Sequence, residues 1–328
     1  MKKPLILLIA FALFFFSCNN SSNNNNKNTN TEEQASIAIP NFNPDSAYYF
    51  VKAQTEFGPR VPNTEAHKKC AQFLQNKLEK YCDKVIVQSF ITKTFDGVKL
   101  NCKNLIGSFS PGKERRILLA AHWDSRPFAD HDTNPANHDK PIDGANDGAS
   151  GVGVLLEVAR QLKEKSPEMG VDIVFFDAED WGTANSNNET GDWWALGSQH
   201  WSKNPHIPNY KAEFGILLDM VGAPNAKFLQ EELSMRYASR IVAKVWSKAY
   251  KFGFKDYFLN TAGNPITDDH FYVNKIAKIP MINIIHQDHS TGTGFVSTWH
   301  TTQDTIENID KRTLYVVGAT VLGVIYDE

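Results

Sequence analysis

The sequence has few cysteines, no block of basic residues and no apolar run as long as a transmembrane helix. Only four cysteines occur among 328 residues, and the formal net charge is −3. The lack of a basic patch argues against a nucleic-acid partner. The apolar run at residues 4–16 is shorter than the roughly 18–20 residues that cross a bilayer, so a transmembrane anchor is disfavoured.

The N-terminus is instead organised like an export signal. Lys2 and Lys3 precede the apolar run, which ends at Ser17 and Cys18. This order of charged, apolar and small residues is typical of a secretory signal peptide. A cysteine directly after the small residue resembles the lipobox of bacterial lipoproteins, in which Cys18 would be acylated and become the mature N-terminus. A plain signal peptide, or a cysteine placed there by chance, is the alternative.

The next segment is polar and of low complexity. Its asparagine-rich part, residues 19–30, cannot bury a core. We therefore expect a lipoprotein signal peptide at residues 1–17, a flexible tether at residues 18–44 and one large domain at residues 45–328.

The lipobox resemblance also implies a location. A lipidated Cys18 would anchor the exported protein to a membrane of the cell envelope. The next residue, Asn19, is not an aspartate and is compatible with an outer-membrane destination. We expect a monomer on the periplasmic face of the outer membrane of a Gram-negative bacterium.

The three remaining cysteines lack the spacing of a zinc knuckle. Cys70 and Cys82 fall in one helical pattern, about 18 Å apart along its axis, which is too far for a disulfide. A bond between Cys82 and Cys102 stays open, and the odd number leaves at least one thiol free or paired between chains. We expect these cysteines to be structural.

Apolar strands alternate with amphipathic helices along the large domain. Short apolar runs of the buried-strand type are interleaved with helices that have apolar residues at three-to-four spacing. This order predicts an α/β fold with a largely parallel sheet and helices on both faces. The expected strands are a pair at 85–95 and 98–109 and buried runs at 115–122, 171–179, 214–222 and 279–286; the expected helices are at 45–56, in the second part of 57–81, and at 150–165, 234–253 and 311–328.

Carboxylates and imidazoles follow five of the predicted strand ends. One aspartate after a strand is usually a helix cap or a turn former, but five strand ends delivering such groups to one edge of a sheet are better explained by a site. Aspartate, glutamate and histidine provide the oxygen and nitrogen ligands that zinc accepts. The residues are His122, Asp124, Asp147, Glu179, Asp180, Asp219, Asp268, Asp269, His270 and His300.

The motifs HWD, DGANDGASG, DAED, LLDMVG, DDH and WHTTQDT resemble, in this order, those of the M28 family of zinc aminopeptidases and their relatives, the glutaminyl cyclases. The resemblance extends over about residues 45–328. It implies a three-layer α/β/α sandwich around a mixed, mostly parallel sheet, and a single zinc-dependent catalytic domain.

The family resemblance leaves two activities to distinguish. Its aminopeptidases bind two zinc ions, and the cyclases bind one. Two zinc ions would use His122, Asp147, Asp180, Asp219 and His300. One zinc ion would use the positions that match Asp147, Asp180 and His300.

Two features resemble the cyclase branch. Asp268 stands where the aminopeptidases usually have a small residue, and Trp299 directly precedes His300. We therefore expect a glutaminyl-peptide cyclotransferase with one zinc ion per chain, which acts on peptides or proteins with an N-terminal glutamine and releases ammonia. The alternatives are a dizinc aminopeptidase and a non-catalytic binding lipoprotein.

The resemblance also implies roles for the acids. Glu179 would act as general base and then general acid. If Asp268 faces Asp219, one of the two should hold a proton, and this network would disfavour a second zinc ion. Alternatively, Asp268 caps a helix that begins near His270, and Asp269 is the important acid.

The other predicted site residues surround the metal. Trp299 is expected to form an apolar wall of the pocket, and Trp193, with its neighbour Trp194, another. Asp124 is expected to orient His122 from behind.

One zinc-ligand position departs from the family pattern. Most relatives have a glutamate where this chain has Asp180, which is one methylene shorter. Both residue types bind zinc, so we expect function to survive.

Overall fold

The computed structural model describes residues 41–183 and 192–328. The predicted signal peptide, Cys18 and the tether up to residue 40 lie outside the described residues. Among the described residues, no helix has both the length and the apolar character to cross a bilayer.

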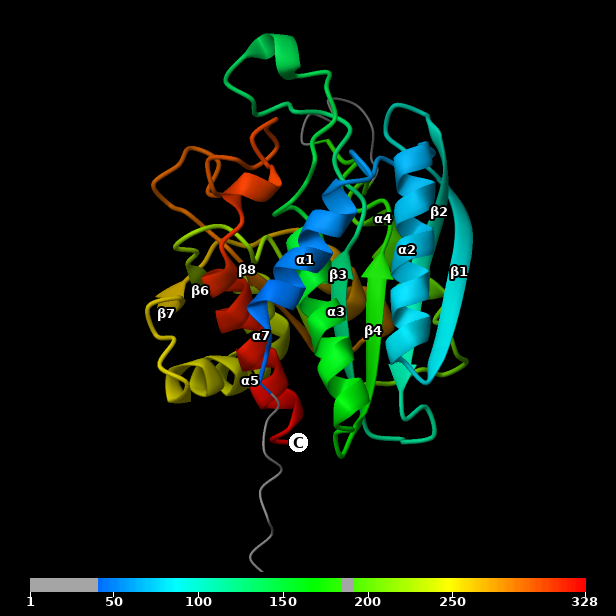
Figure 1. Ribbon diagram of the computed structural model, residues 1–328, viewed down its shortest axis with the longest axis vertical. Helices are drawn as coiled ribbons and strands as arrows, with labels where there is room; N and C mark the ends of the chain where they lie inside the picture. The colour runs from blue at the N-terminus through cyan, green and yellow to red at the C-terminus, as the bar shows by residue number, and fades with distance from the viewer. Residues whose placement is uncertain (1–40, 184–191) are drawn as a thin grey trace, which may run out of the picture. The chain divides into compact units, whose positions relative to one another are not determined.

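The domain is built on a mixed six-stranded sheet with the order β1-β2-β4-β3-β5-β8 (Figure 1). Neighbouring strands β4, β3, β5 and β8 are parallel, whereas β1 and β2 pair antiparallel with each other and β2 pairs antiparallel with β4. The predicted mostly parallel sheet is confirmed. The strands are β1 (Lys84–Lys93), β2 (Lys99–Phe109), β3 (Arg116–His122), β4 (Gly170–Phe176), β5 (Phe214–Asp219) and β8 (Met281–Ile285).

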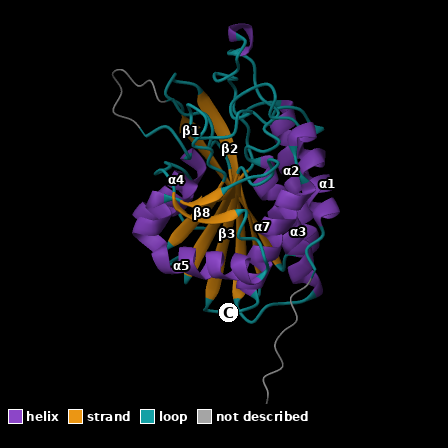
Figure 2. Cartoon of the chain, turned by 90° about the vertical axis from the view of Figure 1, so that its left-hand side faces the viewer, coloured by secondary structure: helices purple, strands orange, loops and turns teal. Residues whose placement is uncertain are grey.

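Helices cover both faces of this sheet, which confirms the three-layer α/β/α arrangement (Figure 2). One layer contains α1 (Pro44–Thr55), α2 (Glu65–Tyr81), α3 (Ala149–Glu164) and α7 (Lys311–Ile325). The other contains α4 (Leu196–Lys203) and α6 (Asp269–Tyr272), which continues into a π-helical turn at Val273–Ala277. The long helix α5 (Glu232–Lys251) packs against β8 and α7.

Several short elements were not predicted from the sequence. Strands β6 (Phe228–Gln230) and β7 (Phe258–Ala262) form a separate two-stranded parallel sheet. The other unpredicted elements are helix α4 and 3₁₀ turns at Pro135–Asn137 and Ile306–Asn308, whereas α6 is the short helix that the sequence suggested near His270.

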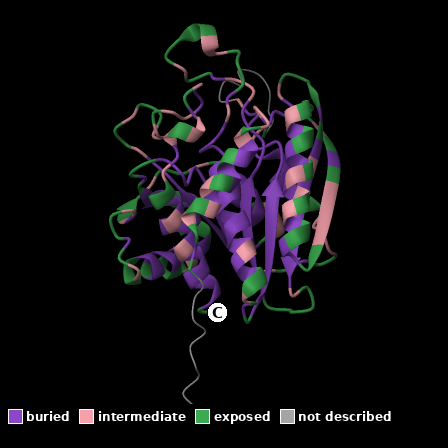
Figure 3. Ribbon diagram, viewed as in Figure 1, coloured by how far each residue is buried: buried purple, intermediate pink, exposed green. Residues whose placement is uncertain are grey.

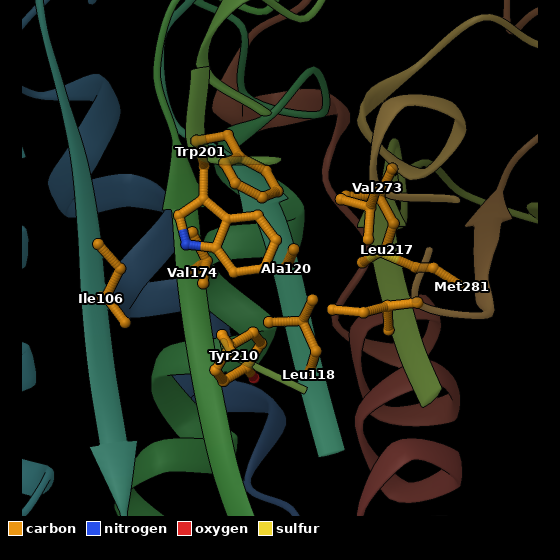
Figure 4. Packing of buried hydrophobic residues seen from close by; sticks show 11 residues of the cluster. Ile106, Leu118, Ala120, Val174, Trp201, Tyr210, Leu217, Val273 and Met281 are labelled. Atoms are coloured by element: carbon orange, nitrogen blue, oxygen red, sulfur yellow. The ribbon is translucent and has the colours of Figure 1, made fainter. Parts of the chain in front are cut away.

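The central strands are buried on both faces, as Figure 3 shows. Successive side chains of a strand point to opposite faces. On β3, Leu118 and Ala120 therefore pack with Trp201 of α4 (Figure 4), whereas Ala121 lies against Gly151 of α3. This two-sided burial explains why the strands appear in the sequence as continuous apolar runs.

The described cysteines Cys70, Cys82 and Cys102 are buried and free, so the possible Cys82–Cys102 bond is not formed. The Cys82 sulfur lies close to Gly107 on β2. Cys102 is five residues away along the same strand, or about 17 Å at the usual rise per residue. A disulfide cannot span that distance.

Candidate active site

The carboxyl ends of the parallel strands bring the predicted acids and imidazoles together. His122 is the last residue of β3, Asp219 is the last residue of β5, and Glu179 and Asp180 follow the end of β4. Asp147 lies just before α3. All five are buried. Sheet topology thus gathers residues that are far apart in the sequence at one edge.

Two sets of possible metal ligands share Asp147. In the first set, the ligand atoms of Asp147, Asp180 and His300 lie within 4.8 Å of one another; in the second, those of His122, Asp147 and Asp219 do so. His300 Nε2 is 3.2 Å from Asp180 Oδ1, and His122 Nε2 is 3.0 Å from Asp147 Oδ1. Both predicted ligand sets are therefore present geometrically.

Unpartnered buried atoms show that these residues fit a cation. Buried polar atoms are almost always hydrogen-bonded, yet Asp180 Oδ2, Asp219 Oδ1 and His122 Nε2 have no hydrogen-bond partner. Carboxylate oxygens and imidazole nitrogens are ligands that zinc accepts. The donor set therefore fits zinc.

Burial disfavours charge on two of the predicted catalytic acids. It raises the pKa of Glu179 well above its usual range, against the effect of His122, and the negative charge of Asp268 adds to the rise. Burial also raises the pKa of Asp219 to about 7, and the charges of Asp147 and Asp268 again contribute. These two acids are therefore inclined to hold protons when no metal is bound.

Asp147 behaves differently from these acids. Burial opposes its ionisation, but the imidazole of His122 outweighs burial and lowers the pKa of the carboxyl group, with His300 contributing. The residue shared by both ligand sets is thus the one most ready to be an anion.

A cavity of about 380 Å³ opens onto this cluster. The predicted catalytic acids Glu179, Asp219 and Asp268 line it, together with the predicted wall Trp299. The other lining residues are Asp147, Asp180, Trp194, Met220, Asn264, Pro265, Ile266, Thr267, Ile285, Thr293, Gly294, Phe295 and His300.

Of the two neighbouring tryptophans proposed for the second wall, Trp194 lines the cavity. Among the described residues that line the cavity, Trp194 is present and Trp193 is not. The Trp194 ring is stacked with His300 at a centroid distance of 6.4 Å, and it lies against the backbone at Gly182. This packing turns Trp194 toward the site.

Asp268 has the predicted role of a helix cap. It is the N-cap of α6, where its side chain accepts from the backbone N–H of Asp269, and Asn283 Nδ2 donates to its other oxygen at 2.6 Å. It nevertheless lines the same cavity as Glu179. His270 points elsewhere and contacts the buried Glu231, with Nε2 3.1 Å from Oε2.

Asp269 stands behind Asp268 and does not line the cavity. It is fully buried, and burial raises its pKa well above the usual range, with the charge of Asp268 adding to the effect. Asp269 therefore favours its neutral, protonated form and lies outside the cavity.

Asp124 connects two strand ends. Its Oδ1 is 3.5 Å from His122 Nδ1, which agrees with the predicted orienting position. It also accepts from the backbone N–H groups of Glu179 at 3.1 Å and Asp180 at 3.2 Å. The sequence indicated the first contact but gave no sign of the second.

Other supporting residues were missed. Asp304 accepts from the backbone N–H groups of Asn146 and Asp147, at 2.8 and 3.0 Å, and so holds the segment that carries the shared ligand. Its presence in the WHTTQDT motif was the available signal. Arg126 and Asp130 contact two other ligand residues, and no motif pointed to them.

Comparisons with known proteins agree with this geometry. Residues 104–325 match the model of peptidase family M28. The chain is 26% identical over 290 residues to the glutaminyl-peptide cyclotransferase of Bos taurus, with 78% of this chain and 74% of that protein covered.

Two solved structures are more similar. The glutaminyl cyclase of Tannerella forsythia is 56% identical with a TM-score of 0.86, and the comparison covers 88% of this chain and all (100%) of that one. A Zn-dependent exopeptidase from Parabacteroides distasonis ATCC 8503 is 54% identical with a TM-score of 0.87, covering 89% of this chain and 100% of that one.

Proposed function

The chain belongs to peptidase family M28, and from this premise we propose that it is a glutaminyl-peptide cyclotransferase that uses one zinc ion. It converts the N-terminal glutamine of a peptide into pyroglutamate and releases ammonia. The observation that carries this function is the position of Glu179, a buried acid in one cavity with a zinc-type ligand set and two tryptophan walls. The similarity to a glutaminyl cyclase at 56% identity supports the same activity.

The reaction is an intramolecular acyl transfer. The α-amine of the substrate attacks the carbonyl carbon (Cδ) of its own side-chain amide, a C–N bond forms, and the bond from that carbon to the amide nitrogen (Nε2) breaks. Glu179 takes the proton that the amine loses and returns it to the departing nitrogen, which leaves as ammonia. The carboxyl group ends the cycle in its starting state.

Asp147, Asp180 and His300 would hold the zinc ion. When bound there, zinc supplies Lewis-acid polarisation of the amide carbonyl.

The cavity walls contribute by positioning. Trp194 and Trp299 line the same cavity as Glu179. A glutamine side chain confined between apolar walls is held bent, with its amine near its own amide, and such confinement supplies a large part of the rate of an intramolecular reaction. Asp124 holds the Glu179 backbone in place through its N–H group.

The proximity of Asp268 supports a single zinc ion. Its charge contributes to the raised pKa of Asp219, which favours a proton on Asp219 over a second metal. The second ligand set, His122, Asp147 and Asp219, favours the competing function of a dizinc aminopeptidase.

One sample decides between these functions. Zinc per chain is measured on purified protein, and the same protein is then assayed for ammonia released from glutaminyl peptides and for free amino acids released from other peptides. We expect one zinc and ammonia. Two zinc ions with amino-acid release would establish the aminopeptidase. Absence of both ammonia and amino-acid release would indicate a non-catalytic binding protein.

The location is a separate proposal that rests on the N-terminal sequence. A lipidated Cys18 would anchor the enzyme, as a monomer, to the periplasmic face of the outer membrane. Radiolabelled fatty acid incorporated into the wild-type protein, but not into Cys18→Ser, is the expected result.

A further inference from the structure

Arg126 is a buried cation that contacts one of the proposed zinc ligands. Its side chain is 4% exposed. Nη1 donates to Asp180 Oδ1 and to the Asp180 carbonyl oxygen, both at 3.2 Å, and to the carbonyl oxygen of Gly182 at 3.3 Å. The carboxylate oxygen Oδ1 of Asp180 is thereby occupied, whereas Oδ2 has no partner.

The same guanidinium forms a bidentate pair with Asp130. Nε donates to Asp130 Oδ1 and Nη2 donates to Asp130 Oδ2, each at 2.7 Å. Asp130 Oδ1 in turn lies 3.4 Å from Nδ1 of His300, a second proposed ligand. His300 Nε2 returns to Asp180 at 3.2 Å. The four side chains thus close a ring around one side of the site.

Arg126 also contacts the pocket wall. Its guanidinium carbon lies 5.1 Å from the centroid of the Trp194 ring, a cation–π contact. One side chain therefore supports two ligand residues and a wall.

We propose that Arg126 and Asp130 are positioning residues of the zinc site. Arg126 fixes the short carboxylate of Asp180 with Oδ2 free for the metal, and Asp130 fixes the His300 imidazole with Nε2 toward it. This inference rests on the zinc site of the proposed function.

The short side chain of the proposed ligand Asp180 explains why it needs support from Arg126 and Asp130. An aspartate reaches one methylene less far than a glutamate, so a small rotation of Asp180 would move its oxygen out of reach of a bound zinc ion. Arginine presents its donors in a rigid planar fork, which fixes a carboxylate in orientation as well as in position. A carboxylate behind a ligating histidine likewise fixes the ring and its tautomer.

The sharpest test compares two aspartates of one loop. Asp130 faces His300, whereas Asp132 accepts from Oγ1 and the backbone N–H of Thr302, at 2.5 and 3.0 Å, and contacts no proposed ligand. The test variants are Asp130→Asn and Arg126→Lys, and the control is Asp132→Asn. Arg126→Lys keeps the positive charge but loses the planar guanidinium. Each variant is titrated with zinc in competition with a chelator. The unfolding temperature of each metal-free variant is measured in parallel.

We expect the zinc dissociation constant to rise roughly 10- to 100-fold in Asp130→Asn and Arg126→Lys. It should stay within about twofold of wild type in Asp132→Asn, since no proposed ligand is touched. Wild-type affinity in both test variants, or equal weakening in Asp132→Asn, would overturn the proposal. If Arg126→Lys does not fold, the zinc affinity of Asp130→Asn alone tests the proposal. The Asp130 side chain is 40% exposed, so its substitution should leave the protein folded. A wild-type protein that binds no zinc refutes the proposed function instead.

Discussion

The two ends of β3 carry buried polar clusters of opposite character. At the amino end, Arg116 donates to both oxygens of Asp172, at 2.6 and 2.7 Å. Ser108 and Tyr210 donate to the same carboxylate, at 2.6 and 2.7 Å. At the carboxyl end, Nε2 of His122 lacks a hydrogen-bond partner.

The difference separates structural polarity from functional polarity. A buried network whose donors and acceptors are all paired rigidifies the fold. Buried polar groups without a partner are instead available to bind a ligand. Changes in the site formed by the carboxyl ends of β3, β4 and β5 should therefore affect chemistry and metal binding, and changes at the amino end of β3 should affect stability.

Glu179→Gln should have the largest effect and should affect chemistry alone. An amide cannot accept and return the proton, so we expect turnover to fall by about 10²- to 10⁴-fold in the ammonia-release assay. Zinc content should match that of wild type, because Glu179 belongs to neither ligand set. Unchanged turnover would refute the assigned base.

Arg116→Met should have the opposite profile. Removing one partner of a buried ion pair leaves an uncompensated charge, which costs about 3–5 kcal/mol of unfolding free energy. Urea denaturation measures this loss. The folded fraction should retain its zinc and its specific activity, and loss of zinc from folded protein would show that the two ends are not independent.

In metal-free protein, the free energy of unfolding should depend on pH because of the buried acids at the carboxyl ends of the strands. The folded-state pKa of Asp219 is raised to about 7, so between about pH 4 and 7 the folded state binds more protons than the unfolded state. Stability should then fall as pH rises, by up to about 1.4 kcal/mol per pH unit for one proton. The raised pKa of His122 acts in the same direction above about pH 6.5, its usual value.

Urea denaturation of chelator-treated protein across this pH range checks the sign, with Asp219→Asn as control. The variant should show a flatter profile than wild type. Saturating zinc should reverse the trend, because its ligands must be deprotonated. Metal-free stability that rises with pH would contradict the assignment.

The smallest effect is expected at the thiols, which neither end uses. Burial raises the pKa of Cys70 to about 12 and raises those of Cys82 and Cys102 further. Since thiolates are the reactive form, native protein should leave all three unlabelled at pH 8, and urea should expose them. Mass spectrometry identifies the labelled positions, and rapid native labelling would disprove their burial.

The sequence predicted the long elements well because each carries a strong apolar period. The missed elements lack that signal: β6 has only three residues, and α4 begins after Ala195 in the left-handed region with no side-chain cap. Their structure is set by tertiary contacts, such as the packing of Trp201 against Phe176.

The site divides in the same way. The acids at strand ends, such as Asp219, were predictable because strand ends meet at one edge of a sheet. Arg126 and Asp130 lie in a loop, and their contacts with Asp180 and His300 depend on how that loop folds back. The choice between adjacent tryptophans depends likewise on packing that no local pattern records.

The polar residues at both ends of β3 also bear on how reliably the chain folds. Arg116 and His122 are six residues apart, so they point to the same face of the sheet. A slip of β3 by one residue would turn both toward the apolar layer of α3, and a slip by two would separate Arg116 from Asp172. A strand of seven residues with mostly interchangeable apolar side chains is thus locked into a single register by the two residues at its ends.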